Sequence, residues 1–168
     1  LVDGNELGAA NDLHLIGSAQ RELGQYEVAV ETFFEARRLY KSLKEVISVA
    51  RCDQKIASCL VELGDGQAAL DRARKAMDVF ETAHDSRRLV FALFEFGKAQ
   101  VLLGEFDEAL ATFDQVLTAA SEDEPRDFDF IVSIESRIAQ VLKELGRTEE
   151  ATEIERRISS VSEILGDE

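Results

Sequence analysis

Apolar residues recur at intervals of three and four along most of the chain, which is the spacing of one face of an α-helix. The first such stretch contains Leu13, Ile16, Ala19 and Leu23. A second stretch begins at Tyr26, directly after a Leu-Gly pair, and similar stretches follow to about residue 165. The pattern predicts eight helices, at about residues 9–22, 26–42, 46–62, 66–83, 86–102, 106–120, 127–144 and 148–165.

The Leu-Gly pair is part of a repeat. Its glycines are Gly24, Gly64, Gly104 and Gly146, which lie 40, 40 and 42 residues apart. Seven positions before them stand the small residues Gly17, Ala57, Gly97 and Ala139, and five positions after them stand Ala29, Ala69, Ala109 and Ala151. Three registers that recur together indicate a two-helix unit of about 40 residues. We expect one domain over residues 1–168, with units at about 9–45, 46–85, 86–125 and 126–165.

The repeated small residues have a predicted structural role. A glycine after the last turn of a helix favours a left-handed conformation that closes the helix. We expect Gly17 and Ala29 to let two helix backbones approach closely, while Phe33 fills the space one turn further on. The two extra residues of the last spacing fall in "SEDEPRD", where Pro125 is expected to break a helix and Asp127 to cap the next one.

This arrangement resembles the tetratricopeptide repeat, which has a small residue in its first helix, a turn, an aromatic residue, and then alanines around a large apolar residue. The family's usual period is about 34 residues, so the chain is similar to the extended variety of about 40. The resemblance covers about residues 9–165. Repeats two and four depart from the pattern, with Ala73 and Glu155 at the positions that correspond to Phe33.

The resemblance implies an all-α fold, a right-handed α-solenoid of four helix pairs with eight antiparallel helices. It also implies that the first helix of each pair lines a concave surface that grips an extended peptide or a helix. The matching positions that we expect to bind a partner are His14, Arg21, Arg51, Gln54, Phe91, Phe94, Lys98, Leu102, Gln140 and Lys143.

Some members of the family grasp a C-terminal carboxylate with a basic clamp. Here the corresponding places hold His14, Ser18, Ser58, Phe91 and Glu95, so a heat-shock chaperone tail is not the expected ligand. Phe91 and Phe94 lie three residues apart, with Lys98 one turn further on, and this set suits an apolar peptide or helix that carries an acidic group. The alternative is that this helix is buried on more than one face, or is covered by chain outside this sequence.

The composition disfavours some classes of binding partner. The net charge is −15, with 19 Lys and Arg against 34 Asp and Glu, and such a surface repels nucleic acid and anionic lipid. No apolar run approaches the roughly 18 residues of a membrane-spanning helix. Cys52 and Cys59 lie seven residues apart on one predicted helix, about 10 Å, too far for a disulfide. They are typical of small core residues in a reducing cytoplasm.

We find no glycine-rich phosphate loop, no nucleophile elbow and no paired-histidine metal motif, so we predict no catalytic residue, no cofactor and no metal. The acidic run of residues 122–124 lacks the alternation of a calcium loop. The first hypothesis is a protein–protein interaction scaffold that binds a peptide or partner helix. The alternatives are a regulatory sensor domain of a larger protein, a self-assembling structural protein that forms homo-oligomers, and, last, an enzyme.

Overall fold

The computed structural model describes residues 4–122 and 127–166, with side chains over 5–122 and 127–160. These residues form eight helices and no strand. The helices are α1 (Gly4–Glu22), α2 (Tyr26–Ser42), α3 (Val46–Glu62), α4 (Gly66–Thr82), α5 (Ser86–Leu102), α6 (Phe106–Glu122), α7 (Phe128–Glu144) and α8 (Thr148–Gly166).

The prediction of eight helices is confirmed, and every boundary but one lies within two residues of the expected position. The exception is α1, which begins five residues early because Gly4 and Gly8 do not interrupt it. Glu6 lies in its first turn, where a negative charge stabilises the helix dipole. The break predicted at Pro125 lies outside the described residues.

The turns between helices follow one design. The residue that closes a helix is left-handed at Gly24, Gly64, Gly104 and Gly146, with φ between +73° and +79°. The following residue donates its backbone N–H to a carbonyl five residues earlier, as from Gln25 to Gln20 at 2.9 Å. This bond is the mark of a glycine C-cap. Asp127 caps α7 as predicted, because its carboxylate accepts a hydrogen bond from the Phe130 N–H.

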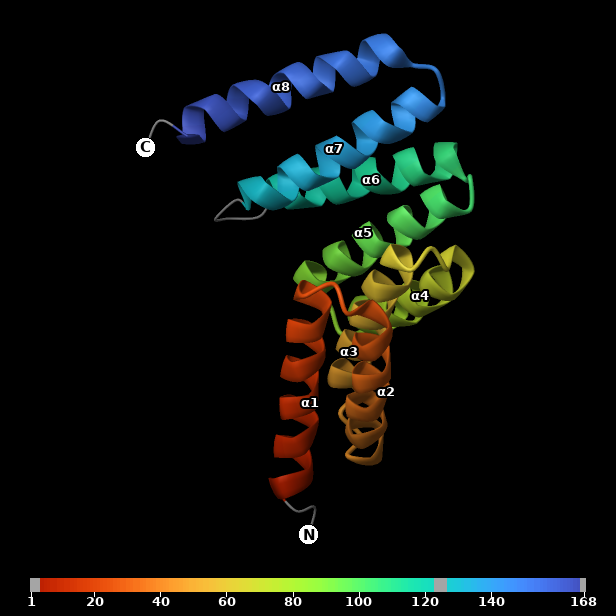
Figure 1. The fold of residues 1–168 in the computed structure, drawn as a ribbon, viewed down its shortest axis with the longest axis vertical. Coiled ribbons are helices and arrows are strands. Elements are labelled where there is room, and N and C mark those ends of the chain that lie inside the picture. Colours follow the sequence, from red (N-terminus) through yellow and green to blue (C-terminus); the bar gives the residue numbers. More distant parts are fainter. Residues whose placement is uncertain (1–3, 123–126, 167–168) are drawn as a thin grey trace.

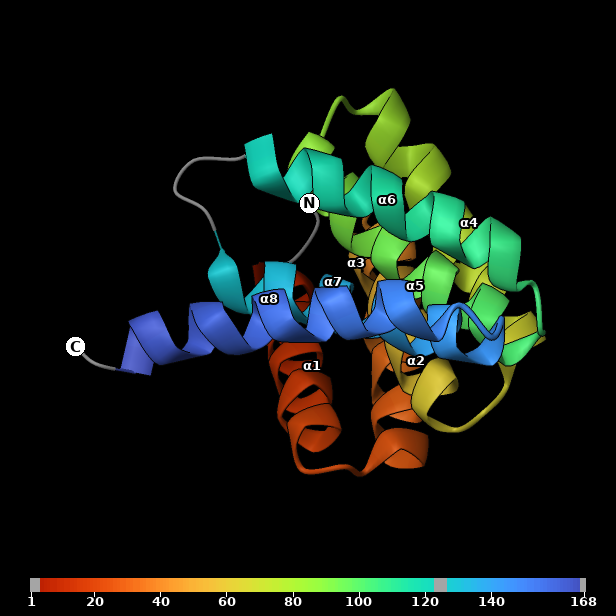
Figure 2. The same cartoon turned by 90° about the horizontal axis from the view of Figure 1, so that it is seen from above.

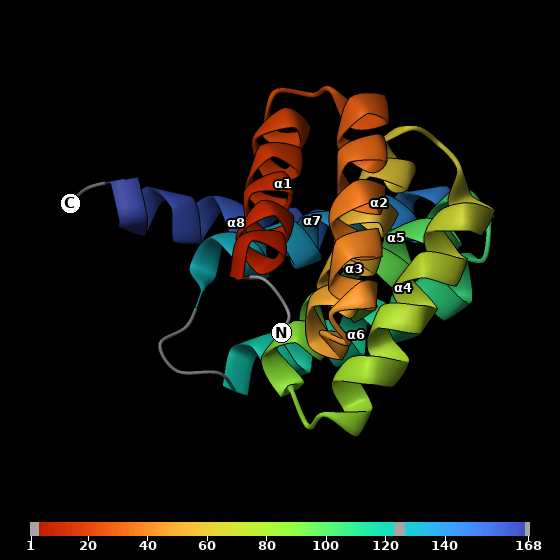
Figure 3. The ribbon, with the colours of Figure 1, turned by 90° about the horizontal axis from the view of Figure 1, so that it is seen from below.

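The helices form two layers. Besides consecutive helices, the contacts among described residues join α1 to α3, α3 to α5, and α5 to α7, and no other pair. The odd-numbered helices are thus the inner layer of a curved array, and the even-numbered helices are the outer layer. In Figure 1 the array winds from α1 at one end of the long axis to α8 at the other. Figure 2 looks onto the α8 end, and Figure 3 looks onto α1 and α2.

The repeated small residues are buried. Ala29, Ala69, Ala109 and Ala151 are all fully buried. A Cβ added to Gly17 would lie only 2.9 Å from the ring of Phe33, and one added to Gly97 would lie 2.7 Å from the ring of Phe113. The glycine therefore makes room for an aromatic ring of the next helix. The close approach that we expect at Gly17 involves the Phe33 ring directly.

Candidate functional site

All the residues predicted to bind a partner lie on the odd-numbered helices. The structure separates them along the inner layer. His14, Arg21, Arg51 and Gln54 lie on α1 and α3, Phe91, Phe94, Lys98 and Leu102 lie on α5, and Gln140 and Lys143 lie on α7.

His14 is buried against α2 and α3. Its Nε2 lies 3.4 Å from Nη2 of Arg51, its Nδ1 lies 3.7 Å from Sγ of Cys52, and its ring meets the ring of Phe33 edge-on at 5.4 Å between centroids. Burial, followed by the charges of Arg51 and Lys55, lowers the pKa of His14 to about 4. The ring is therefore neutral at pH 7 and contributes to packing.

The contact between Cys52 and His14 has the composition of a thiol–histidine pair but not its electrostatics. Burial raises the pKa of the Cys52 thiol to about 12. A protonated thiol beside a neutral imidazole is not an activated nucleophile. Cys52 and Cys59 are both buried and free, as the spacing predicts.

Three cations gather where α1 faces α3. Arg21 lies in the last turn of α1, and Arg51 and Lys55 lie one turn apart on α3. Burial, followed by the charge of Arg21, lowers the pKa of Lys55, while Glu95 of α5 acts in the opposite direction. All three side chains are half-buried. This corner of the inner layer is therefore basic, although the whole chain is strongly acidic.

Lys98 is held by its neighbours. Its Nζ lies 2.6 Å from Oε2 of Glu95, 4.0 Å from Oε1 of Glu62, and 5.2 Å from the centre of the Phe94 ring. Only 8% of the residue is exposed. Its charge is thus compensated within the chain before any ligand arrives.

A hollow of about 160 Å³ lies where the last turns of α3, α5 and α7 meet. Three predicted residues line it, namely Lys98, Leu102 and Gln140, and Leu102 is 45% exposed. The complete lining is Val61, Glu62, Lys98, Val101, Leu102, Arg137, Gln140 and Val141. It offers apolar contact together with polar groups of both signs.

The predicted aromatic residues join α5 to α7. The centroid of the Phe130 ring of α7 lies 4.7 Å from that of Phe91 and 5.3 Å from that of Phe94. The Phe94 centroid also lies 5.8 Å from that of the buried Phe113 ring of α6. Phe91 and Phe94 are both half-buried. Each ring therefore packs partly against neighbouring helices and is partly exposed on the inner surface. The sequence left open whether these rings face a ligand or the core, and the structure has features of both.

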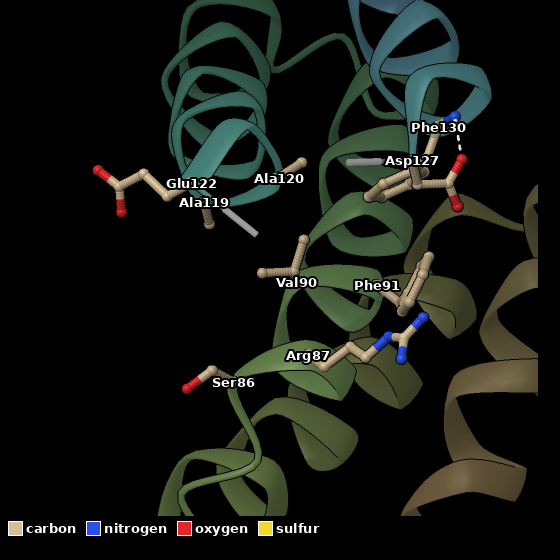
Figure 4. Close-up of a pocket in the computed structure, with 9 residues that line it drawn as sticks. All are labelled: Ser86, Arg87, Val90, Phe91, Ala119, Ala120, Glu122, Asp127 and Phe130. Carbon is tan, nitrogen blue, oxygen red and sulfur yellow. Dashed lines mark hydrogen bonds between the residues drawn. The ribbon is translucent and has the colours of Figure 1, made fainter. Parts of the chain in front are cut away.

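A pocket of about 280 Å³ opens beside these rings (Figure 4). Its lining residues are Ser86, Arg87, Val90, Phe91, Ala119, Ala120, Glu122, Asp127 and Phe130. The Asp127 carboxylate is turned to the Phe130 backbone N–H, so it serves the helix cap (Figure 4). The interior is thus formed mostly by aromatic and aliphatic surface, of a size for one apolar side chain.

Two predicted residues lie apart from these features. Lys143 forms an ion pair with Glu155 of α8, so its charge is directed to the last helix rather than to the hollow. Gln54 is half-buried on α3, between the turns that carry Arg51 and Ser58.

The sequence interpretation missed Lys55, Arg137 and Phe130. Lys55 could have been found, because it follows Arg51 by four residues and so shares its helix face. Phe130 gave no such signal, because it is separated from Phe91 by 39 residues and only the helix packing brings them together.

In the described part of the chain, no three His, Cys, Asp or Glu side chains are placed to hold a metal ion. Across residues 4–122 and 127–166, no helix combines the length and the hydropathy that a membrane span requires.

Comparisons with known proteins agree with this architecture. The tetratricopeptide repeat family model matches residues 48–122. No curated protein matches the sequence. Aspartyl phosphate phosphatase F from Bacillus subtilis is similar in structure with a TM-score of 0.77 and 17% identity, over 96% of this chain and 42% of that one.

Two further structures of Rap proteins are similar. A Rap protein complexed with competence and sporulation factor has a TM-score of 0.81 and 18% identity, over 94% of this chain and 43% of that one. The Rap conjugation gene regulator of the plasmid pLS20, in complex with the Phr* peptide, has a TM-score of 0.80 and 21% identity, over 99% of this chain and 45% of that one. The chain thus spans less than half the length of these three proteins. The match to the tetratricopeptide repeat family thus covers the centre of the chain, and the similarity to solved helical solenoids extends along its length.

Proposed function

We propose that the chain is an interaction scaffold that binds a peptide or a partner helix along its inner layer. The observation that carries this proposal is the continuity of that layer, on which α3, α5 and α7 jointly enclose a hollow, with an apolar pocket beside Phe91 on α5. Because the pocket lies at the first turns of α5 and the hollow lies at its last turns, a segment lying along α5 would reach both. We also propose that residues 1–168 act as one domain, since each described helix contacts the next one along the chain.

The known proteins support the proposal by analogy. Two of the similar structures contain a bound molecule: the Rap protein holds competence and sporulation factor, and the plasmid regulator holds the Phr* peptide. The identities are low and the likeness is one of fold, so the ligand of this chain depends on the residues of its own surface. Rigid helices that hold Phe91, Leu102 and Gln140 at set positions lower the entropic cost of ordering a ligand.

We propose a binding role rather than a catalytic one, in a reducing cytoplasm. The one thiol–histidine contact is not activated, because burial keeps Cys52 protonated. The buried free cysteines fit a reducing compartment. The net charge of −15 disfavours nucleic acid and anionic membranes as partners.

The test is a selection of random peptides displayed against the purified chain, followed by affinity measurements on the winners. Leu102→Asp alters the hollow, and Val28→Asp is the matched control because Val28 is 48% exposed on the outer helix α2. We expect selected peptides to bind the parent and the control equally, and Leu102→Asp at least about tenfold more weakly. Equal binding by all three proteins would place the ligand elsewhere, and a selection without winners would contradict the function itself.

A second candidate is a sensor domain whose ligand changes the curvature of the array and so controls another part of a larger protein. It is favoured by the length of the relatives, of which this chain spans less than half, and by the gene regulator among them. Small-angle scattering with and without a selected peptide separates the two candidates. A sensor changes its radius of gyration on binding, whereas a rigid scaffold keeps it.

A further inference from the structure

The basic corner between α1 and α3, formed by Arg21, Arg51 and Lys55, carries positive charge that is not compensated by a close carboxylate of the described residues. Arg51 approaches His14 at 3.4 Å, and His14 is neutral at pH 7, so this contact does not compensate the charge of Arg51. Among the described residues, no carboxylate lies within 4.0 Å of Arg51 or Lys55. Arg21 has one such neighbour, Glu22, at 4.0 Å.

The nearby carboxylates lie closer to another cation. Glu95 lies 2.6 Å from Nζ of Lys98, although its charge also partly offsets the lowering of the Lys55 pKa, and Glu62 lies 4.0 Å from Nζ of Lys98. The Glu22 side chain is 72% exposed, and an exposed pair at 4.0 Å contributes little. The Nε atom of Arg21 is buried and has no hydrogen-bond partner among the described residues. An orphaned buried donor in a charged group is costly and is usually satisfied by a ligand or a water molecule.

Charge across the whole chain makes the arrangement more unusual. The chain has 34 acidic residues and only 19 basic ones, yet three of the basic residues share one half-buried corner without adequate counter-charge. Like charges in a partly desolvated place repel each other and reduce stability. An anion bound between α1 and α3 would remove the repulsion and provide the missing acceptor for Arg21.

We propose that Arg21, Arg51 and Lys55 form a subsite that binds the carboxylates of an acidic segment within the peptide ligand. This inference rests on the proposed peptide-binding function and adds a ligand class to it. The peptide source is favoured over a free anion because the subsite belongs to the same inner layer as the hollow, which α3 also lines.

The position of the subsite gives the ligand a direction. The acidic part lies at α1 and α3, and the apolar part lies toward the aromatic pocket of α5, α6 and α7. A ligand that carries its acidic and apolar residues at opposite ends can satisfy both places at once. The ligand class is therefore a peptide with an Asp- or Glu-rich end and an apolar end.

The experiment is the same display of random peptides, performed in parallel on three full-length proteins. The first is the parent. The second is the variant Arg21→Gln, Arg51→Gln, Lys55→Gln. The third is a control, Arg38→Gln, Lys41→Gln, Lys75→Gln, which removes the same charge from exposed positions on α2 and α4. Circular dichroism and a thermal melt confirm folding first, and Lys55→Gln alone replaces the triple variant if that variant does not fold.

We expect the parent and the control to select peptides rich in Asp and Glu, and the subsite variant to lose that enrichment. A chosen acidic peptide should bind the subsite variant about tenfold or more weakly, and its affinity for the parent should fall as salt is raised. The subsite variant should melt at the same temperature as the parent or higher, because the repulsion is gone.

Other outcomes are distinguishable. If the parent selects peptides without acidic enrichment, the subsite proposal is wrong while the binding function stands. If no protein selects peptides, the proposed function fails as well. If inorganic phosphate alone displaces an acidic peptide at the same concentration as a short glutamate peptide does, the corner is a general anion site, and the assignment to peptide carboxylates is overturned.

Discussion

Gly97 and Phe113 show how single residues set the packing of a repeat. The Gly97 Cα faces the Phe113 ring so closely that a Cβ there would lie 2.7 Å from it. Repeat one has the same combination in Gly17 and Phe33, whereas repeat two pairs Ala57 with Ala73 at the same positions. A missing methyl in one helix thus accompanies a large ring in the next, and volume is conserved across the pair.

We expect Gly97→Ala to lower the free energy of unfolding by about 1–2 kcal/mol, because overpacking costs about 1–3 kcal/mol and better helix propensity returns up to about 1 kcal/mol. Phe113→Ala should cost about 3–5 kcal/mol, because the ring is fully buried. Urea unfolding of both single variants and the double variant measures the coupling.

The double variant should be more stable than the sum of the single effects by at least about 0.5 kcal/mol, because it recreates the alanine pair of repeat two. Gly8→Ala is the control, since a Cβ at Gly8 meets nothing within 4 Å, and it should not destabilise the chain. Simple additivity at Gly97 and Phe113 would mean that the glycine has another role.

The turns between helices have the same backbone geometry but differ in the residue at the left-handed position. The turns inside the repeats place glycine in the left-handed position, but the turns between repeats place Lys44 and His84 there, with φ of +61° and +53°. The hydrogen-bond pattern is the same, as in the bond from Asp85 N–H to the Phe80 carbonyl at 2.9 Å. The period of 20 residues for one helix and one turn is thus kept, although the residue at the left-handed position changes from turn to turn.

We predict that His84→Gly raises the free energy of unfolding by about 0.5–1 kcal/mol. A left-handed residue with a Cβ costs about 1–2 kcal/mol, and the extra chain entropy of glycine offsets part of this gain. Gly104→Ala, at the equivalent position of the next turn, should have the opposite sign. Thermal melts of the two variants test this, and a lower melting temperature for His84→Gly would contradict it.

A second feature of the elements is that one helix position can have opposite environments in different repeats. Ile16 of α1 and Ile56 of α3 are 40 residues apart and hold the same place in the repeat. Ile56 is fully buried and packs in the cluster of Ala29 and Phe33 on α2. Ile16 is 48% exposed, because no described helix packs on that face of α1.

Ile56→Ala should therefore destabilise the chain by about 2–5 kcal/mol, whereas Ile16→Ala should change stability by less than about 0.5 kcal/mol. Chemical denaturation of both variants is the measurement, and each serves as the control for the other. A large loss for Ile16→Ala would show that its face is covered in solution, for example by a second copy of the chain.

For the whole molecule, the basic corner inside an acidic shell links stability to pH. His14 has a pKa of about 4 when folded, against about 6.5 when unfolded. The unfolded chain therefore binds a proton at His14 over the range between these values, while the folded chain does not. Stability must fall as the pH falls from about 6.5 towards 4.

We expect His14 alone to contribute a loss of about 2 kcal/mol between pH 7 and pH 5. The measurement is the free energy of unfolding of the parent and of His14→Gln at both pH values. The difference between the two pH values should be smaller in the variant by that amount, because carboxylates affect both proteins alike. Equal pH dependence would show that His14 is not shielded from protons in the folded state.

The repeat, the eight helices and most of their ends could be predicted from local sequence alone. These depend on interactions within a few residues, namely the three-to-four spacing of apolar side chains and the left-handed glycines after each first helix. The sequence also identified the alanines that are fully buried, because every repeat presents them at the same place.

The side-chain contacts of the inner layer could not be predicted in this way, because they depend on tertiary packing. Which ring meets Phe91, which carboxylate meets Lys98 and which charge stays uncompensated depend on the crossing of helices far apart in the chain. The ion pair of Lys143 with Glu155 likewise joins α7 to α8. The local sequence pattern does not predict these pairs, because they depend on distances that are set by the packing of the whole array.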